Sequence, residues 1–230
     1  MISPDKQTYL IEADSLFYQY GDKDLAQLVL KGATLDLRSG EFVILAGPSG
    51  SGKSTLLSLI GALRQCQEGN LSIVGYDVKG ANEEIMRTVR KNIGYVFQQH
   101  NLLGFLTAVQ NVEMTLQMFP EYSREMRRDL SAEILEKVGL GRHLDYFPSQ
   151  LSVGQKQRVA IARSLVHRPK LILADEPTAS LDSKTGIQVT EILHDMVKTL
   201  GCGALVVTHD NRIFSYADRI LHIEDGVVKI

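Results

Sequence analysis

The fold class of this chain is decided by the stretch Phe42-Val43-Ile44-Leu45-Ala46-Gly47-Pro48-Ser49-Gly50-Ser51-Gly52-Lys53-Ser54. Its first five residues are all apolar, which is typical of a short strand buried in a parallel sheet. Residues 47–54 fit the spacing G-x-x-x-x-G-K-[ST]. Leucine and isoleucine then recur at helical spacing, which predicts a helix over 53–63. A strand, a glycine-rich turn and a helix in this order predict a phosphate-binding loop.

This loop has the composition that a phosphate group requires. Glycines let the backbone wrap closely around an anion, and successive N–H groups and the helix N-terminus then point at it. We expect Lys53 to reach the β- and γ-phosphates of a nucleotide and the Ser54 hydroxyl to bind Mg²⁺. The predicted nucleotide-binding residues of this segment are Gly47, Pro48, Ser49, Gly50, Ser51, Gly52, Lys53, Ser54 and Thr55.

Two further polar positions follow apolar runs. Asp175 and Glu176 end the run 171–174, and His209 follows the run 204–208. In open parallel sheets, ligands bind at the carboxyl ends of strands, so these side chains are expected beside the phosphate loop. Since neighbouring side chains on a strand point in opposite directions, Asp175 is expected to hold Mg²⁺ and Glu176 to polarise the attacking water. His209 is placed to donate a hydrogen bond to the γ-phosphate.

The rest of the chain alternates between strand and helix patterns. Two β-rich runs lie within 8–38 around a polar turn at 21–24, and further strands are predicted at 71–74, 93–97, 171–174, 204–208, 219–223 and 227–230. Helices are predicted at 123–138 and 184–200, within and after a helical block over 107–167. Strands alternating with helices imply an α/β fold with a mostly parallel sheet, into which the helical block is inserted.

Composition narrows the class of protein. Hydrophobic residues make up 44% of the 230 residues and charged residues 23%, which is typical of a globular domain and excludes a disordered or collagen-like chain. The formal net charge is −2, without the basic excess usual for proteins that bind duplex nucleic acid, so no nucleic-acid partner is expected. No apolar run approaches the roughly 18 residues that span a bilayer, and residues 1–6 lack an apolar signal core. We therefore expect a cytoplasmic chain that reaches a membrane only through a partner.

The segment Leu151-Ser152-Val153-Gly154-Gln155 precedes a predicted helix that carries several cations. Serine and glycine at a helix N-terminus can bind an anion. Taken alone, the segment favours an ordinary helix cap.

The order of these motifs, over nearly the whole chain, resembles the nucleotide-binding subunit of ABC (ATP-binding cassette) transporters. In that resemblance Tyr20 matches the aromatic residue that stacks on adenine, and residues 47–54 match Walker A. Gln98 matches the Q-loop glutamine, residues 151–155 the family signature, and Asp175 and Glu176 Walker B with its catalytic glutamate. Asp182 lies in a segment similar to the D-loop, and His209 matches the switch histidine.

The resemblance implies ATP and Mg²⁺ as ligands and assigns the residues to roles. It places Glu176, His209 and Gln98 in catalysis, and Ser54, Gln98 and Asp175 around Mg²⁺. It adds Tyr20, Ser152, Gly154, Gln155 and Asp182 to the nucleotide contacts. Family subunits pair head to tail, so that each ATP lies between Walker A of one subunit and the signature of the other.

The implied fold is a P-loop NTPase ABC cassette, with a RecA-like, mostly parallel sheet core, an antiparallel β subdomain and an inserted α-helical subdomain. We expect a single ATP-binding domain over 1–230. Residues 1–100 and 168–230 would form the ATP-binding core with the β subdomain, and about 101–167 the helical signature subdomain.

One signature position departs from the family pattern L-S-G-G-Q, because Val153 stands where the first glycine is usual. A β-branched residue resists positive φ and adds bulk near the partner's nucleotide, so this position is expected to affect the competence of the site.

Residues 97–103 and 106–112 resemble the group that serves lipoprotein release and macrolide export, and within it the DevA-type glycolipid exporter ATPases. This implies an ATP-dependent homodimer on the cytoplasmic face of the inner membrane, bound to an integral-membrane permease and through it to a periplasmic adaptor. The alternatives are the ATPase of a methionine-type importer, a non-transporting regulator of cell-wall enzymes, and a DNA-repair or translation-factor ATPase. The last class usually joins two cassettes or carries long coiled coils, whereas this chain has one cassette.

Overall fold

The central element of the fold is a six-stranded sheet. The structure is a computed structural model that describes residues 9–21 and 25–229. The strand order is β10-β9-β3-β8-β7-β6. Strands β3, β6, β7, β8 and β9 run parallel, and β10 pairs antiparallel with β9. The bounds are β3 Phe42–Ala46, β6 Ile93–Val96, β7 Leu171–Asp175, β8 Gly203–Thr208, β9 Arg219–Glu224 and β10 Val227–Lys229. The predicted mostly parallel sheet is confirmed.

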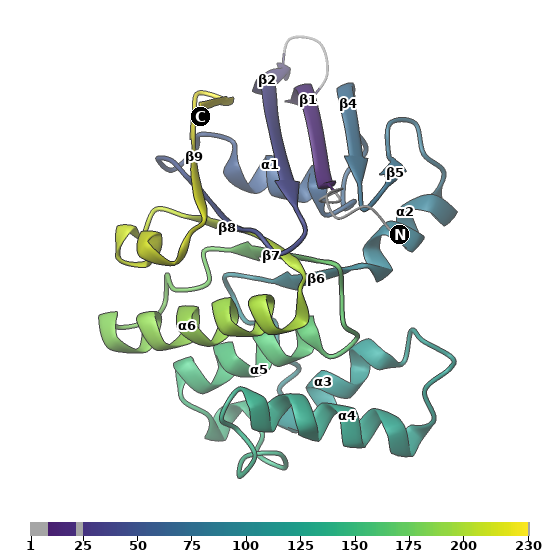
Figure 1. Cartoon of the computed structure of the whole chain (residues 1–230), viewed down its shortest axis with the longest axis vertical. Helices are drawn as coiled ribbons and strands as arrows, with labels where there is room; N and C mark the ends of the chain where they lie inside the picture. Colours follow the sequence, from purple (N-terminus) through teal and green to yellow (C-terminus); the bar gives the residue numbers. More distant parts are fainter. Residues whose placement is uncertain (1–8, 22–24, 230) are drawn as a thin grey trace, which may run out of the picture.

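A second, antiparallel sheet lies above the first in Figure 1. Its strand order is β2-β1-β4-β5, with β1 Tyr9–Tyr20, β2 Gln27–Arg38, β4 Glu68–Ile73 and β5 Tyr76–Asp77. The two long strands β1 and β2 are the β-rich runs predicted over 8–38. The predicted polar turn lies largely outside the described residues, as does the last residue of the strand predicted at 227–230.

Six α-helices surround the sheets over the described residues. They are α1 Lys53–Ile60, α2 Glu83–Lys91, α3 Ala108–Leu116, α4 Arg124–Lys137, α5 Val153–Leu165 and α6 Ser183–Leu200. The sequence analysis did not predict α2, a largely polar helix in which only Met86 and Val89 are buried. Its ends are nevertheless marked, because Asn82 caps the N-terminus, two glutamates occupy the first turn, and Arg90 and Lys91 the last.

Two hydrophobic cores cover the two faces of the six-stranded sheet. Alternation along β3 separates them, since Val43 and Leu45 face the antiparallel sheet and α1. Phe42 and Ile44 face the core that α3, α4, α5 and α6 complete on the other side. Figure 1 shows these layers, with the helices α3–α6 gathered on the side away from the antiparallel sheet. Among the described residues, no helix is long and apolar enough to cross a membrane.

Two side chains fix the loop that joins β6 to α3. Asn111 is buried and accepts from the Leu103 N–H while donating to the carbonyls of Leu103, Leu106 and Thr107. From α5, Arg163 donates to the carbonyls of His100 and Asn101 at 2.7 and 2.6 Å. The loop that carries Gln98 is therefore tied to α3 and to α5.

Candidate active site

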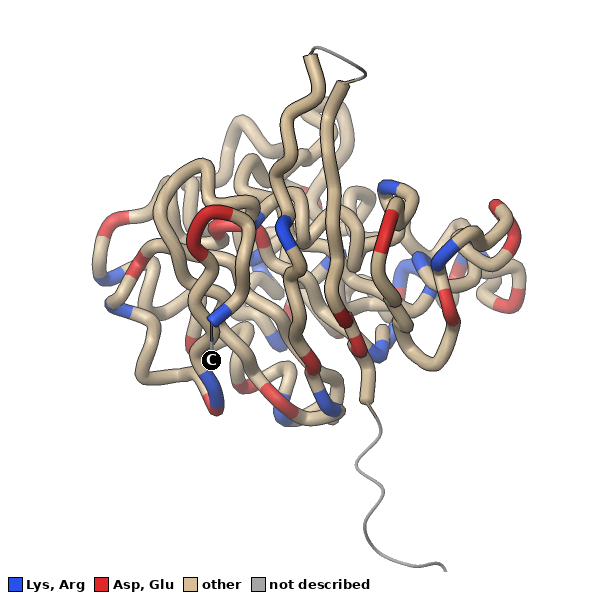
Figure 2. Tube along the Cα trace, turned by 90° about the horizontal axis from the view of Figure 1, so that it is seen from above, with Lys and Arg blue, Asp and Glu red and all other residues tan. Residues whose placement is uncertain are grey.

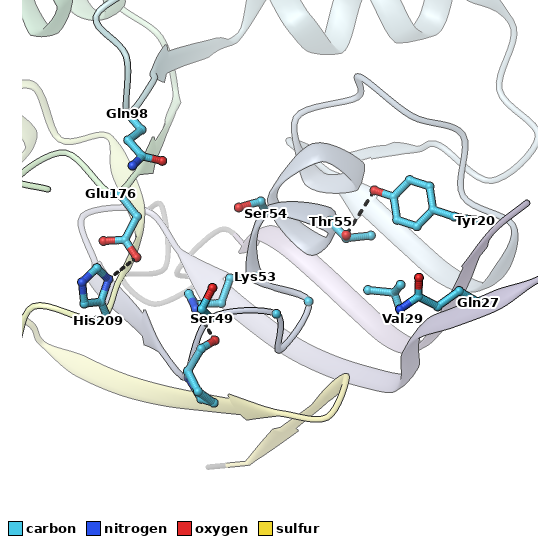
Figure 3. A pocket seen from close by; sticks show the side chains of 13 residues that line it. Tyr20, Gln27, Val29, Ser49, Lys53, Ser54, Thr55, Gln98, Glu176 and His209 are labelled. Carbon is cyan, nitrogen blue, oxygen red and sulfur yellow. Dashed lines mark hydrogen bonds and ion pairs between the residues drawn. The ribbon is translucent and has the colours of Figure 1, made fainter.

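A cleft of about 670 Å³ opens at the carboxyl ends of the parallel strands. Figure 3 shows side chains from separate segments around it: the end of β1, the start of β2, the loop before α1 with the start of that helix, and the residues that follow β6, β7 and β8. The cleft is lined by Tyr20, Gln27, Val29, Pro48, Ser49, Gly50, Gly52, Lys53, Ser54, Thr55, Gln98, Glu176 and His209.

The loop before α1 has the backbone that its glycines predict. Gly50 and Gly52 have φ of 80° and 102°, values that side chains with a Cβ rarely adopt. A Cβ on Gly47 would lie 2.2 Å from the carbonyl oxygen of Ile223 in β9. Lys53 is only 7% exposed, and its Nζ donates to the carbonyls of Gly47 and Pro48 at 2.8 and 2.7 Å. The ammonium is thus held inside the loop, where successive N–H groups and the start of α1 favour an anion.

Ser54 lines the cleft, and Asp175, which is not among the lining residues, lies within hydrogen-bond distance of it. The Ser54 hydroxyl donates to Asp175 Oδ1 at 3.4 Å, across 121 residues of sequence. Burial raises the pKa of the Asp175 carboxyl, while the hydrogen bond from Ser54 and the charge of Lys53 oppose that shift. A hydroxyl and one carboxylate beside a phosphate loop are the hard oxygen ligands that Mg²⁺ accepts together with substrate phosphates. The residues present therefore fit this ion.

Glu176 occupies a strained backbone position directly after β7. Its φ is 47°, in the left-handed region that a non-glycine residue seldom adopts, and its N–H donates to the carbonyl of Val207 at 2.8 Å. The expectation that strand alternation alone separates the two carboxylates is therefore wrong, because Glu176 has left the extended conformation. The left-handed turn is what directs this side chain into the cleft shown in Figure 3.

Both oxygens of the Glu176 carboxylate have partners. His209 Nδ1 lies 2.7 Å from Oε1, and the Thr208 hydroxyl donates to Oε2 at 3.1 Å. His209 therefore contacts the carboxylate through one ring nitrogen, while its largely exposed side chain also lines the cleft (Figure 3). Thr208 was missed in the sequence, although it ends an apolar strand next to the predicted histidine.

A cluster of charged side chains supports the loop after β8. Asp210 accepts from Arg212 through both carboxylate oxygens at 2.7 Å, and from the Thr178 hydroxyl at 3.0 Å. The bonds from Arg212 hold the pKa of Asp210 below its usual value. Arg212 also donates to Ser183, the first residue of α6, at 2.5 Å. The loop carrying His209 is thereby joined to the segment carrying Asp182.

Tyr20 and Gln98 lie in the cleft with the phosphate loop. The Tyr20 hydroxyl is 3.2 Å from Thr55 Oγ1 in α1, as Figure 3 shows. Gln98 enters from the loop after β6. Gln27 and Val29 of β2 complete the wall near Tyr20 and were not predicted; their position across the hairpin from Tyr20 is the only sequence signal for them.

The signature residues and Asp182 are not among the residues lining this cleft. Ser152 caps α5 by accepting from the Gln155 N–H, and the Gln155 side chain accepts from the Ser152 N–H in return. The Gln155 amide also lies 3.1 Å from His143 Nε2. Asp182 caps α6 by accepting from the Thr185 N–H. Within one chain, Ser152 and Asp182 thus cap helices, and the cap at Ser152 is the one that its segment alone predicts.

Val153 does not carry the strain expected of it. It is the first residue of α5, and it is not among the residues with positive φ. A valine at this position therefore does not have to adopt a left-handed backbone conformation. The expectation that it would resist a positive φ here is wrong. Val153 is 44% exposed next to Ser152, and the effect of its bulk on the site stays a prediction.

The sequence model of the ABC transporter family matches residues 30–179. The chain belongs to this family. The ATP-binding protein MJ1508 of Methanocaldococcus jannaschii is 40% identical over 220 residues, which cover 95% of this chain and 97% of that ABC protein. The macrolide export ATP-binding/permease protein MacB of Rhodopirellula baltica is 43% identical over 213 residues, or 92% of this chain and 31% of MacB. This ABC chain thus spans about a third of the MacB proteins it matches.

Solved structures agree with this assignment. The ATP-binding cassette MJ0796, in a dimeric post-hydrolysis state with ADP and Pi, superposes with a TM-score of 0.87 at 39% identity. That match covers 96% of this chain and 97% of the other. The predicted ABC cassette fold is confirmed, as is the resemblance to the macrolide-export group. As an ABC cassette, the chain is an ATP-binding ATPase subunit.

Proposed function

We propose that this ABC cassette hydrolyses ATP in the cleft around Lys53, using Glu176 as the general base. The observation that carries the proposal is the meeting of Lys53, Gln98, Glu176 and His209, from distant segments, around one cleft beside the phosphate loop. Tyr20 would stack on adenine, and residues 47–55 would hold the phosphates. Ser54, Asp175 and Gln98 would hold Mg²⁺, which when bound neutralises the charge that develops on the phosphates.

The chemical step follows from how the Glu176 carboxylate is held. A carboxylate fixed by His209 and Thr208 can accept a proton as water attacks the γ-phosphorus and the bond to the β,γ-bridging oxygen breaks. Lys53 would stabilise the charge on the phosphate oxygens, and ADP and inorganic phosphate would leave. His209 would keep the carboxylate oriented by donating from Nδ1–H. Donation from Nε2 to the γ-phosphate as well requires a proton on both ring nitrogens.

We further propose that two copies of the chain assemble head to tail when ATP binds. Ser152, Gly154, Gln155 and Asp182 lie outside the cleft of their own chain, which supports a role opposite the cleft of a second copy. The helical segment, about 101–167, would then act as a signature subdomain against the core formed by 1–100 and 168–230. The dimeric structures of the related cassette MJ0796 support this arrangement.

The ATPase would power an export complex. The names of the related MacB proteins join an ATP-binding part to a permease, and this chain matches only the ATP-binding part. We infer an integral-membrane permease as its partner, a place on the cytoplasmic face of the inner membrane, and lipid, lipoprotein or drug-type cargo. An extracytoplasmic adaptor would bind through the permease, and a DevA-type system stays a prediction.

The substitution Glu176→Gln tests the catalytic role. The amide keeps the size of the side chain but cannot accept the proton, so turnover should fall by about 10²–10⁴-fold. ATP binding, measured by calorimetric titration, should persist, because Lys53 and the loop are unchanged. Turnover close to that of the wild type would remove Glu176 from the role of general base.

Purification of the tagged chain from gently solubilised membranes tests the proposed role in an export complex. A co-purifying permease with four membrane helices and a large extracytoplasmic domain would support export. An importer-type permease, or no membrane protein, would contradict it and leave the ATPase chemistry untouched.

A further inference from the structure

The ring of Tyr20 is held by side chains that lie outside the nucleotide cleft. The Arg64 guanidinium carbon is 4.8 Å from the Tyr20 ring centroid, a distance typical of a cation–π contact. Tyr18 packs edge-on against the same ring, with centroids 5.1 Å apart. Arg64 and Tyr18 both contact this ring, but neither is among the residues that line the cleft with Tyr20.

The backbone next to Tyr20 has its own clamp. The pairing of β1 with β4 reaches Phe17 opposite Glu68 and goes no further along the described strand. Beyond that point, the Gln67 side chain takes the place of a neighbouring strand. Its Oε1 accepts from the Gln19 N–H at 2.8 Å, and its Nε2 donates to the Gln19 carbonyl at 3.1 Å. One amide side chain thus satisfies both backbone groups of the residue before Tyr20.

Both clamping residues come from the short segment that joins α1 to β4. The helix α1 begins at Lys53 and ends at Ile60, so one element carries the phosphate-binding lysine at its start and leads into Arg64 and Gln67 at its end. The Tyr20 hydroxyl lies near Thr55 in the same helix. The position of the ring is therefore fixed relative to the phosphate loop.

We infer that Arg64 and Gln67 are positioning residues for the purine base of the nucleotide. They hold Tyr20 so that the ring surface facing the cleft is preformed for a planar base, which lowers the ordering cost of stacking. This inference rests on the proposed function, in which Tyr20 stacks on adenine. The two residues should affect binding of the base alone, because no hydrogen bond or ring contact among the described residues joins Arg64 or Gln67 to the phosphate loop.

The test compares ATP with tripolyphosphate as calorimetric probes of the full chain. Tripolyphosphate contacts the phosphate loop but has no base. Arg64→Ala should weaken ATP binding by about 2- to 5-fold, the range for an exposed cation–π contact. Gln67→Ala removes two hydrogen bonds and should weaken ATP binding by about 2- to 10-fold. Neither variant should change the affinity for tripolyphosphate.

Three further variants sharpen the test. Gln65→Ala is the matched control, since Gln65 is exposed in the same segment and its side chain makes no hydrogen bond with the described residues; it should bind both probes like the wild type. Arg64→Lys keeps the charge but loses the planar group, and should restore part of the ATP affinity. In a Tyr20→Ala background, Arg64→Ala should have no additional effect, because the ring it positions is gone.

The outcomes separate this inference from the function on which it rests. Equal weakening of ATP and tripolyphosphate by Arg64→Ala would overturn it, because the residue would then act on the loop or on folding. Unchanged ATP affinity in both alanine variants would also overturn it. A wild-type chain that binds tripolyphosphate as tightly as ATP would contradict the role of Tyr20, and one that binds neither would contradict the proposed function.

Discussion

At the scale of single residues, the site depends on how one carboxylate is held. Glu176 has a left-handed backbone, and each of its carboxylate oxygens has a partner. Such strain persists only where the surroundings determine it. Here the Val207 carbonyl and Thr208 belong to the end of β8, and His209 directly follows it. The strand that neighbours β7 therefore orients the proposed general base.

Thr208→Val tests this orienting role. Valine keeps the shape but can neither donate to Glu176 nor accept from the Asp210 N–H. Loss of the bond to Glu176 should lower kcat about 5- to 10-fold, the cost of one hydrogen bond of about 1 kcal/mol. The KM for ATP should stay unchanged, because the phosphate loop is intact. Thr190→Val is the control, as Thr190 is equally buried and donates only to the Gly186 carbonyl within α6. A rise in KM without loss of kcat for Thr208→Val would refute the orienting role.

At the scale of elements, helix starts carry much of the proposed chemistry. Helix α1 begins with the phosphate loop, α5 with the signature and α6 with Asp182. Each N-terminus exposes N–H groups and a partial positive charge, which suits an anion. In one chain, α1 alone of these three has its start in the lining of the cleft, and in the proposed dimer a second copy would bring α5 to the phosphates.

Ser152→Ala separates a cap from a nucleotide contact. Ser152 accepts from the Gln155 N–H at 3.2 Å, and Ser123 caps α4 by accepting from the Met126 N–H at the same distance. Ser152→Ala and its control Ser123→Ala should each lose about 1 kcal/mol in the free energy of unfolding, because each removes a helix cap. Steady-state assays should show turnover reduced about 10- to 100-fold for Ser152→Ala alone, as expected for a lost bond to a charged phosphate. Equal ATPase rates in the two variants would limit Ser152 to capping.

The sequence predicted those parts of the site that follow from local pattern. The loop 47–55, with Asp175 and His209, could be placed because parallel strands deliver their carboxyl ends to one edge. The orientation of Glu176 and the helical backbone of Val153 could not, since tertiary contacts set both. Helix α2 was missed because only two of its side chains are buried, and its caps were not weighed. The signature was recognised only by resemblance, because its local pattern is that of any capped helix.

At the scale of the whole molecule, charge is balanced and stability depends on burial. Figure 2, which looks down on the fold from above, shows Lys and Arg interspersed with Asp and Glu. The net charge is −2, so no single-sign field dominates.

His167, after α5, is a buried polar side chain with an incomplete set of hydrogen bonds. Its ring stacks on Phe119, and Nε2 lies 3.2 Å from the Ile93 carbonyl oxygen. Nδ1 is buried without a partner among the described residues.

This histidine makes the fold sensitive to mild acid. Burial lowers the pKa of His167 from 6.5 to about 4. In this pH range the unfolded chain binds the proton more readily, so stability present above pH 6.5 is lost as pH falls toward 4. Urea unfolding at pH 7 and pH 5 should show the wild type losing about 1–2 kcal/mol more than His167→Gln. The exposed His222→Gln should behave like the wild type, and an identical pH response in all three proteins would contradict this account.

The most direct test of the central claim is the ATP turnover of an equimolar mixture of Glu176→Gln and Ser152→Ala chains. Each variant alone should turn over ATP at least about 10-fold more slowly than the wild type, the first through its cleft and the second through its signature. In a mixed head-to-tail dimer, the intact cleft of the Ser152→Ala chain meets the intact signature of the Glu176→Gln chain, so turnover should reappear on mixing. A mixture no more active than its components would contradict an ATPase site shared between two copies of this chain.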